Sequence, residues 1–591
     1  MTDSPNKQDS PENQTPQHAL TNREIADIFD TVADMLQLKG EIIHRVMAYR
    51  RVAQSIRELP RDLRAVAAED KLQDIDGVGA VLEEKIREML DSGHLGFYDE
   101  LASEIPPGLV EILRINGVGP KKAMQFYKDL GIQTVAALKT AAEEGKIGKL
   151  PGMGAKTEKK ILEGIASLAS VTERVRLDIA LTAAERIMAV LLNLPQALRG
   201  DIGGSIRRGR PTIGDIDLLV AAEDAAPIMA AFVTNPGVAR IVANGPTKST
   251  VELLNGRLCD LRVLPPDRYG TALNYFTGSQ LHNIHLRALA QERGLTLNEW
   301  AFTPLDGKPE ILCATEEEVY MVLGLPFIPA ELREDRGEIE AAYAGKLPHL
   351  IQASDIHSDL HMHTTWSDGK LSVREMAETA RARGLSHIVI TDHSVSLGVA
   401  GGLSIERLRA QREEIRQVDS EMGPNFRVFQ GTEMEIRTDG QLDFPDEVLA
   451  ELDVVVASLH SGLRQERAQV TQRLLTAIRN PHVDIIGHPR GQLIPSREGA
   501  DLDMDAVFAA AKETGTVLEI NASPQRLDLD DGHARRAIEM GVMLSIDTDS
   551  HSAADFDQLR YGIMTARRGW VQPENVINTW PTDKFIEWMR G

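Results

Sequence analysis

Three aspartates have the type and spacing that metal-assisted phosphoryl transfer requires. Asp215 and Asp217 flank Ile216, so a strand would place both carboxylates on one face and the isoleucine in the core. Asp260 repeats this alternation in the run 258–264 and would supply a third carboxylate from a neighbouring strand. Carboxylates on rigid strands can hold two Mg²⁺ or Mn²⁺ ions against a triphosphate and a 3′-hydroxyl group. The pattern predicts a catalytic site for nucleotidyl transfer.

Polar residues upstream of these aspartates could hold the triphosphate. Gly204 and Ser205 can offer a backbone amide and a hydroxyl group to phosphate oxygens. Arg207 or Arg208 can neutralise the phosphate charge. An Asp-x-Asp pair at the end of a strand is by itself a common structural feature. Its combination with Gly-Ser and the paired arginines favours the catalytic interpretation.

A second group of ligand-type residues lies in the C-terminal part of the chain, where ten of the 16 histidines follow residue 350. Nearly all of the group come at the C-terminal ends of expected strands, where parallel α/β sheets and barrels place their sites. A lone histidine in such a position is more typical of a hydrogen-bonded core. Nine ligand-type residues, strand after strand, instead predict a metal site that activates water for hydrolysis. They are His361, His363, Asp368, His393, Glu433, His460, His488, Asp549 and His551.

An internal repeat occupies the N-terminal part of the chain. The segments 75–86, 115–126 and 150–161 each contain an apolar residue, Gly-x-Gly and an amphipathic helix. Glycines allow close backbone approach, and the following helix N-terminus offers free amides to a phosphate. A helical packing unit with glycine at its turn is the alternative, but three copies favour binding to a nucleic-acid backbone. The expected DNA-binding residues are Gly77, Gly79, Gly117, Gly119, Lys121, Lys122, Gly152, Gly154 and Lys156.

The elements that must position these residues change along the chain. Residues 24–60 read as two helices, and short apolar strands begin near residue 200. The proline-rich and charged stretch 325–351 reads as a connector. Beyond it, strands alternate with helices, which implies a parallel sheet or barrel.

The bulk composition narrows the class of protein. The chain has 591 residues, too many for one core, and no stretch is apolar enough to span a membrane. Its polar N-terminus reads as a disordered tail and not a signal peptide. Two cysteines favour a reducing compartment, so a cytoplasmic protein is expected. A net charge of −23 is unusual for a DNA-binding protein, but binding depends on local patches and backbone donors.

Two segments, GSIRRGRPTIGDIDLLV (204–220) and 258–300, resemble X-family DNA polymerases, the polymerase beta group. The resemblance implies that Asp215, Asp217 and Asp260 bind the catalytic metals and that Asp260 accepts the proton of the primer hydroxyl group. It implies a triphosphate site, a sugar pocket and contacts to the nascent base pair. The corresponding nucleotide-binding residues are Gly204, Ser205, Arg208, Gly214, Tyr275, Phe276, Gly278, Asn283 and Arg287.

The first hairpin region resembles the lyase domain of the same family, including AYRRVA at 48–53. Lys85 falls on the position of its catalytic Schiff-base lysine. Val81, however, stands where the polymerase beta group has another lysine, which weakens the expected phosphate grip. A solvated lysine in an ion pair is the alternative for Lys85.

The histidine motifs resemble the polymerase-and-histidinol-phosphatase (PHP) family, a distorted seven-stranded barrel that holds up to three ions. All nine ligand positions of its pattern are filled, which implies Mn²⁺ and/or Zn²⁺ at this site. Arg490 and Arg526 lie near the predicted rim, as phosphate contacts or as surface ion pairs.

The expected fold is multidomain α+β and α/β: helical helix-hairpin-helix domains, a nucleotidyltransferase palm with a mixed sheet, and a C-terminal distorted (β/α)7 PHP barrel. The expected boundaries are a disordered tail (1–21), a lyase-like domain (22–95), a fingers-like domain (96–173), the palm (174–268), a thumb-like subdomain (269–330), a linker (331–354) and the PHP domain (355–591).

The favoured hypothesis is a repair polymerase that fills short gaps in base excision repair or end joining, with a PHP domain that processes 3′ ends. Its partners would be gapped or primer-template DNA and deoxynucleoside triphosphates, without a membrane, and the protein is expected to be a monomer. The alternatives are a PHP-type small-molecule phosphatase with a regulatory nucleotidyltransferase module, and a non-catalytic scaffold for DNA ends.

Overall fold

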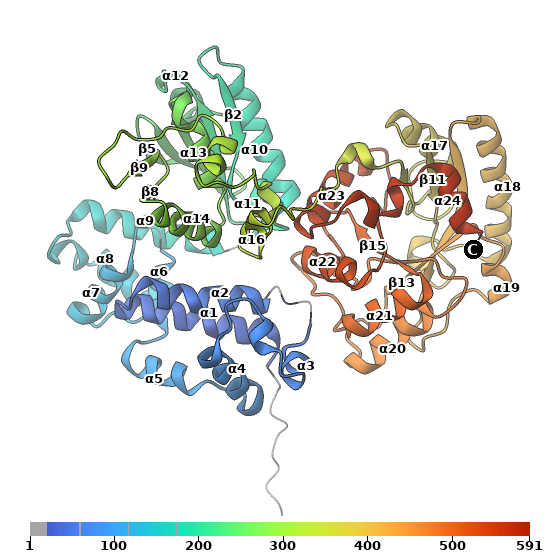
Figure 1. Ribbon diagram of the computed structural model, residues 1–591, viewed down its shortest axis with the longest axis horizontal. Helices are drawn as coiled ribbons and strands as arrows, with labels where there is room; N and C mark the ends of the chain where they lie inside the picture. Colours follow the sequence, from blue (N-terminus) through green and yellow to red (C-terminus); the bar gives the residue numbers. More distant parts are fainter. Residues whose placement is uncertain (1–19, 58, 60, 116, 173, 591) are drawn as a thin grey trace, which may run out of the picture. The chain divides into compact units, whose positions relative to one another are not determined.

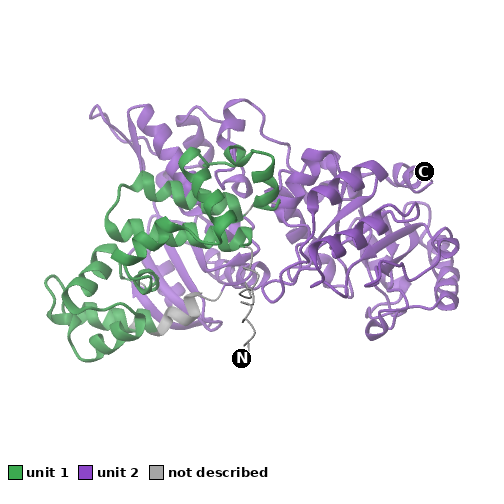
Figure 2. Ribbon diagram, turned by 90° about the horizontal axis from the view of Figure 1, so that it is seen from below, with its two compact units in different colours: residues 1–169 green, residues 170–591 purple. Residues whose placement is uncertain are grey.

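A computed structural model describes residues 20–590 of the chain, except residues 58, 60, 116 and 173 (Figure 1). The chain divides into two compact units, Met1–Ala169 and Ser170–Gly591, and each is described by itself (Figure 2). The disordered tail expected at 1–21 falls almost wholly outside the described residues. No helix of the described residues is long and apolar enough to cross a membrane.

The first unit is helical, as the sequence predicts. A capping box of Thr21 and Glu24 starts its first helix, and Gly40 ends that helix in the left-handed conformation. The two helices expected over residues 24–60 are confirmed. The helices are α1 (Asn22–Lys39), α2 (Ile43–Arg57), α3 (Leu63–Ala68), α4 (Ala80–Ser92), α5 (Gly96–Glu104), α6 (Gly108–Leu113), α7 (Pro120–Leu130), α8 (Val135–Glu143) and α9 (Ala155–Thr172).

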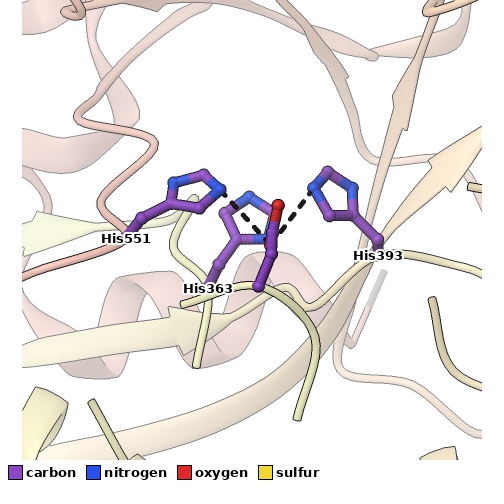
Figure 3. A group of neighbouring side chains, drawn as sticks. His363, His393 and His551 are labelled. Carbon is purple, nitrogen blue, oxygen red and sulfur yellow. Dashed lines mark ion pairs between the residues drawn. The ribbon is translucent and has the colours of Figure 1, made fainter. Parts of the chain in front are cut away.

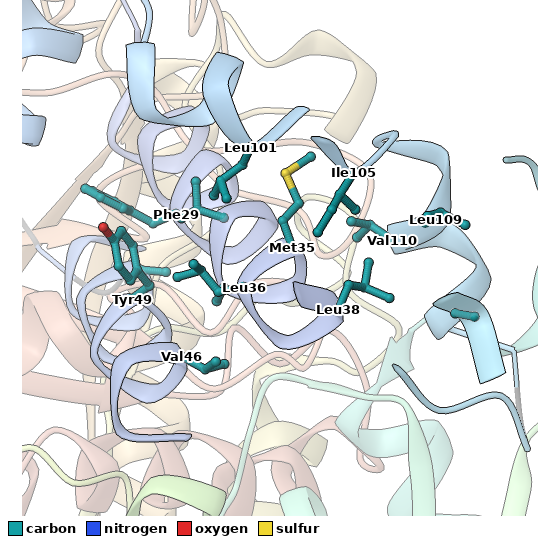
Figure 4. Packing of buried hydrophobic residues seen from close by; sticks show 14 of the residues in the cluster. Phe29, Met35, Leu36, Leu38, Val46, Tyr49, Leu101, Ile105, Leu109 and Val110 are labelled. Atoms are coloured by element: carbon teal, nitrogen blue, oxygen red, sulfur yellow. The ribbon is translucent and has the colours of Figure 1, made fainter. Parts of the chain in front are cut away.

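The core of the first unit forms around one face of α1. Phe29, Met35 and Leu36 repeat at helical spacing and are buried (Figure 4). Phe29 meets Tyr49 of α2 with ring centroids 5.8 Å apart. Residues of α5 and α6 complete this core, among them Leu101. The helices that follow the Gly-x-Gly turns are therefore held in place by a common apolar core.

The second unit begins with a mixed sheet in the order β2-β4-β7-β6-β5. The strands β4 and β7 pair in parallel, whereas their neighbours pair antiparallel, as expected for a palm. The elements are β1 (Val175–Arg176), α10 (Leu177–Leu192), β2 (Arg199–Ile202), α11 (Gly204–Arg207), β3 (Thr212–Ile213), β4 (Asp215–Ala221), α12 (Ala226–Val233), β5 (Val238–Asn244), β6 (Lys248–Leu253) and β7 (Leu258–Leu264).

A smaller helical part follows the palm. It consists of α13 (Tyr269–Thr277), α14 (Gln280–Glu292), β8 (Leu295–Leu297), β9 (Phe302–Pro304), α15 (Glu316–Val322) and α16 (Glu338–Tyr343).

The segment 331–354 was expected to be a linker, but the structure packs it into the second unit. Leu332, Ile339 and Leu350 are buried in one core with residues of α14 and α15. Arg333 has no exposed surface and pairs with Glu316 at 2.5 Å. The linker prediction rested on charge and proline content. It failed because the charged residues at 333–335 and 338 are paired and buried rather than solvated.

The C-terminal part is a barrel of seven parallel strands in sequential order, as expected for the PHP fold. Met362 and Ser550 form a parallel bridge that links the first strand to the last. The strands are β10 (Ser358–Asp359), β11 (His387–Ile390), β12 (Arg427–Glu435), β13 (Val454–Ser458), β14 (Ile485–Gly487), β15 (Val517–Asn521) and β16 (Leu544–Asp547). The helices are α17 (Val373–Ala382), α18 (Ile405–Met422), α19 (Asp446–Leu449), α20 (Arg467–Ile478), α21 (Met504–Thr514), α22 (Asp531–Met540), α23 (Leu559–Arg568) and α24 (Thr582–Met589).

The barrel and the palm share apolar packing. The core beneath the palm sheet includes Leu527 and Tyr561, which belong to the C-terminal part of the chain. The packing of the second unit therefore extends from its five-stranded sheet to the barrel part of the chain.

Candidate metal centres

The palm sheet brings the three aspartates together. Asp217 of β4 lies directly opposite Asp260 of β7 in the parallel register, and Asp215 opens β4. Ile216, between the two β4 aspartates, has no exposed surface. The alternation along the strand therefore turns the carboxylates to one face, and the core beneath fixes that face.

Cationic side chains surround this cluster. Arg262 reaches Asp217 at 3.6 Å and Asp260 at 3.5 Å, and Lys248 reaches Asp260 at 3.3 Å. Thr250 donates a hydrogen bond of 2.6 Å to Asp260. Burial, and next the charge of Asp215, raise the pKa of Asp217 to about 7. The carboxylates thus lie in a site that strongly favours added positive charge.

The sequence interpretation assigned no role to Lys248, Thr250 or Arg262. Arg262 follows Asp260 by two residues on the same strand, so period-2 alternation could have placed it on the same face. Lys248 and Thr250 reach Asp260 from β6 through the antiparallel register, which no sequence spacing reveals.

The glycine at position 204 is needed at the palm site. Gly204 has φ +59°, and a Cβ atom there would lie 2.4 Å from Asp217 Oδ2. The preceding Gly203 donates a backbone hydrogen bond of 2.8 Å to the Asp217 carbonyl group. Any side chain at 204 would displace the carboxylate, so glycine allows the backbone to lie against the aspartates. Ser205 follows on α11.

The other predicted nucleotide residues form one connected group. The Arg262 guanidinium lies 3.7 Å from the Phe276 ring centroid, and Phe276 contacts Tyr275 edge to face. Asn283 donates to the Tyr275 carbonyl group at 2.7 Å, and Arg287 donates to the Asn283 carbonyl group at 3.2 Å.

The remaining members of this group lie beside arginines. Arg208 donates to the Thr277 carbonyl group, next to Gly278. Gly214 lies beside Arg174, whose Nη1 would be 3.3 Å from a Cβ atom at 214. The structure places all nine predicted residues on α11, β3–β4, α13 and α14 or the turns between them.

The barrel brings its nine candidate ligands together at the C-terminal ends of the strands. Their ligand atoms form three groups within 4.8 Å: His363, Asp368, His393 and His551; His361, His363 and Glu433; and His393, Glu433 and His460. The other two candidates also reach these groups. His488 Nε2 lies 2.9 Å from Glu433, and Asp549 lies 3.1 Å from His363 Nε2.

Three imidazoles of the first group turn toward one another (Figure 3). The ring of His363 lies 4.2 Å from that of His393 and 4.2 Å from that of His551, measured between centroids. Among the described residues, the buried Nε2 of His361 and both ring nitrogens of His363 have no hydrogen-bond partner. Buried imidazole nitrogens that face carboxylates in this way fit a divalent metal ion.

Buried carboxylates orient two of the histidines by contacting the ring nitrogen that points away from Glu433. Glu519 lies 2.7 Å from Nδ1 of His361, and Glu435 lies 2.7 Å from Nδ1 of His460. Each contact leaves Nε2 of the ring directed toward Glu433. Such contacts fix the ring and its tautomer for metal binding. The sequence interpretation missed both glutamates, although Glu435 follows the candidate ligand Glu433 by two residues on β12.

The electrostatics of the barrel site suit cations. Burial opposes the charge of Glu433, but His460, His393 and His361 outweigh it and hold the pKa of Glu433 well below its usual range. Burial, together with the positive charge of Arg526, lowers the pKa of His488 to about 3. Against the effect of burial, the carboxylates instead raise the pKa of His393 to about 10 and those of His460 and His551 to about 9, so a bound metal would displace protons from these rings.

The two rim arginines differ in their environment. Arg490 pairs with Asp530 at 3.0 Å, which matches the ion-pair alternative for this residue. Arg526 lies 3.6 Å from Asp549, one of the candidate ligands. Arg526 is thus the rim arginine that reaches the metal-ligand set.

In the first unit, the first glycine of each hairpin turn adopts the left-handed conformation. The first glycine of each turn, Gly77, Gly117 or Gly152, has φ between 78° and 86°. Gly79 and Gly119 cap the N-termini of α4 and α7, and a Cβ atom at either would meet nothing within 4 Å. The turns thus leave room for a backbone to approach. Lys121 and Lys156 are exposed, whereas Lys122 donates to the Gly117 carbonyl group at 2.8 Å.

Lys85 of α4 is half-buried beneath an aromatic ring. Its Nζ lies 4.1 Å from the Phe97 centroid, and burial lowers the pKa of Lys85 below its usual value. The departure at Val81 is a largely exposed apolar side chain on the same helix.

Family models match four parts of the chain. They describe a helix-hairpin-helix domain (20–95), a SAM-like helix-hairpin-helix tandem (109–167), the DNA polymerase beta thumb (272–334) and the PHP domain (359–523). Together with the aspartate triad and the barrel ligands, they define an X-family DNA polymerase joined to a PHP domain.

Curated relatives specify the family. The chain is 38% identical to DNA polymerase/3′-5′ exonuclease PolX of Bacillus subtilis over 95% of its own length and 97% of the relative. It therefore belongs to the PolX family. A probable phosphatase of Thermoanaerobacter sp. is 31% identical over 37% of this chain and 89% of the relative. DNA polymerase lambda of Rattus norvegicus is 26% identical over 52% of this chain and 56% of the relative.

The raised pKa of Asp217 predicts a gain in stability when its charge is removed. Because folding raises this pKa from 3.8 to about 7, ionisation costs stability progressively between these values and fully above them. We expect Asp217→Asn to raise the free energy of unfolding by about 4 kcal/mol at pH 8 in a chelator, and by little at pH 4. Urea unfolding at both pH values measures this, with the exposed Glu223→Gln as control. An equal gain at both pH values would contradict the electrostatic cause.

The sharing of Glu433 predicts an unequal loss of bound metal. Glu433 belongs to two of the three ligand groups, whereas His551 belongs to one. We expect Glu433→Gln to lose more than one equivalent of Mn²⁺ and His551→Ala to lose no more than one. Elemental analysis after equilibrium dialysis measures both, with the exposed Glu447→Gln as control. Equal losses in the two variants would show that the groups do not share this ligand.

Proposed function

We propose that the chain is a gap-filling DNA polymerase whose PHP domain processes 3′ ends. The observation that carries the proposal is the aspartate triad on the paired strands β4 and β7, bordered by the glycine turn at 203–204. The similarity to PolX over nearly the whole chain supports it. A small-molecule phosphatase with a regulatory palm would not need this complete site.

The palm residues suit in-line transfer of a nucleotide. Mg²⁺ or Mn²⁺, when bound, neutralises the triphosphate and lowers the pKa of the primer hydroxyl group. Asp260, oriented by Thr250 and Lys248, accepts the hydroxyl proton. The 3′-oxygen then bonds to the α-phosphorus, and the bond from that phosphorus to the pyrophosphate breaks. Ser205 and Arg208 hold the triphosphate, while Tyr275, Phe276 and Gly278 border the sugar.

The barrel residues suit hydrolysis of a phosphate ester. Up to three Mn²⁺ or Zn²⁺ ions, when bound, supply a hydroxide nucleophile near neutral pH. Glu519 and Glu435 keep the imidazoles in register, and Arg526 offers positive charge beside Asp549. Likeness to a probable phosphatase supports 3′-phosphate removal, and likeness to PolX supports 3′-5′ exonuclease action. Cleavage at abasic sites is a third reaction open to this site.

The hairpin turns supply the DNA-binding surface. Their glycines and helix N-termini would hold the phosphate backbone without reading its sequence. Lys85 would form a Schiff base with the ring-opened C1′ aldehyde of a 5′-deoxyribose phosphate and release water, since its lowered pKa favours the free amine. We place the protein in the bacterial cytoplasm as a monomer that associates with the nucleoid through DNA.

Separate sites predict separable activities. On one gapped duplex with a 3′-phosphate or a mismatched 3′ end, we expect Asp215→Ala to lose at least about 100-fold of nucleotide incorporation but to keep end processing. His361→Ala should show the reverse. Product gels with labelled primer, with and without Mn²⁺, measure both reactions. Retained incorporation in Asp215→Ala would refute the palm assignment.

The lyase proposal predicts a trapped covalent adduct. Borohydride reduction of a mixture with 5′-deoxyribose phosphate DNA should link the wild-type protein to the DNA. We expect Lys85→Ala to lose most of the adduct and Lys71→Ala, a lysine paired with Glu69, to keep it. An undiminished adduct in Lys85→Ala would assign the nucleophile elsewhere.

A further inference from the structure

A buried charge network joins the PHP part of the chain to the palm. Arg568, the last residue of α23, has 1% of its surface exposed. Its Nη1 donates to Glu334 at 2.9 Å and to the Arg208 carbonyl group at 2.7 Å, and its Nη2 donates to Asp531 at 3.0 Å. Glu334 is only 2% exposed. These contacts tie residues of the barrel, the helical part and the palm into one group.

Glu334 links this group to the nucleotide site. One of its oxygens, Oε1, accepts from both Arg568 and Arg208, the second at 3.1 Å. Arg208 in turn donates to the Thr277 carbonyl group, next to the sugar-pocket residue Gly278. Burial opposes the charge of Glu334, but Arg208 and Arg568 outweigh it and hold the pKa of Glu334 far below its usual range. Glu334 therefore stays ionised and divides its charge among Arg208, Arg568 and, at 3.7 Å, Arg210.

Close packing makes this arrangement rigid. Gly209, directly after Arg208, has φ +67°, and a Cβ atom there would lie 3.1 Å from Met564 and 3.4 Å from the Arg568 side chain. Leu527 and Tyr561 of the barrel part contribute to the palm core. The turn that carries Arg208 thus rests directly on α23.

We infer that Arg568 is a positioning residue for nucleotide binding, acting through Glu334 on Arg208. Arg568 competes with Arg208 for the Glu334 carboxylate. It also fixes the backbone of the Arg208 turn. The PHP part of the chain therefore has a second role, independent of hydrolysis: it holds the triphosphate arginine of the polymerase site in place. This inference rests on the proposed polymerase function.

The test compares two neighbouring arginines of α23. Arg567 also pairs with a residue outside the barrel, Glu331, at 2.7 Å. Among the described residues, its hydrogen bonds reach Glu331 and the Ile351 carbonyl group and not the palm. We expect Arg568→Met to raise the KM for deoxynucleoside triphosphate about tenfold, with kcat changed less than about threefold. Arg567→Met should stay within about twofold of wild type in both constants. Single-nucleotide incorporation on gapped DNA measures them, and thermal unfolding reports the fold of each variant.

A double variant tests whether Arg568 acts on Arg208 through Glu334. In a Glu334→Gln background, Arg568→Met should raise the KM less than it does in the wild-type background, because only its direct hydrogen bond to the Arg208 carbonyl group remains to be lost. If Arg568→Met does not fold, Arg568→Lys replaces it, with an expected KM increase of about threefold.

The outcomes distinguish failure of the positioning role of Arg568 from failure of the proposed polymerase function. Wild-type protein without incorporation would refute the polymerase proposal. Active wild type with equal KM values in the Arg568 and Arg567 variants would refute the positioning role alone. An undiminished effect of Arg568→Met in the Glu334→Gln background would refute the route through Glu334.

Discussion

Repulsion between carboxylates held at short range is the constraint on which both metal centres depend. Asp215, Asp217 and Asp260 share one face of the palm sheet, and burial already raises the pKa of Asp217 to about 7. A flexible loop would relax such a cluster by moving the charges apart. Strands anchored by a dry core cannot, so the packing of residues such as Ile216 sustains the electrostatic cost. Bound cations would relieve this repulsion, so the same cluster that destabilises the fold favours metal binding.

The two centres offset the same repulsion by different means. In the palm, Arg262 and Lys248 approach the carboxylates and would move or share them when metals bind. In the barrel, six imidazoles surround three carboxylates, which, against the effect of burial, raise the pKa of His393, His460 and His551, so that a bound metal would displace protons from these rings. The palm arrangement suits metal ions that enter together with the charged nucleotide. The barrel arrangement suits metal ions that remain bound to the protein.

Much of both sites could be predicted because strand periodicity and strand ends fix side-chain direction. Asp217 and Asp260 follow from alternation, and the barrel ligands follow from their place after apolar runs. The residues that orient the ligands were missed, since Thr250 and Lys248 depend on the pairing of β6. The segment 331–354 was misread because charge was taken to mean exposure, whereas Arg333 is buried against Glu316, and Glu334 is buried against Arg208 and Arg568.

The segment 331–354 explains why the polymerase part and the barrel part are packed into one compact unit. A solvated linker would let the palm and the barrel fold and move independently. Instead, Glu334 lies between Arg208 and Arg568, and removing one partner of such a buried group leaves an uncompensated charge. Leu527 and Tyr561 add apolar packing that neither part keeps alone. The barrel is therefore part of the scaffold that the polymerase site stands on, whatever ester it hydrolyses.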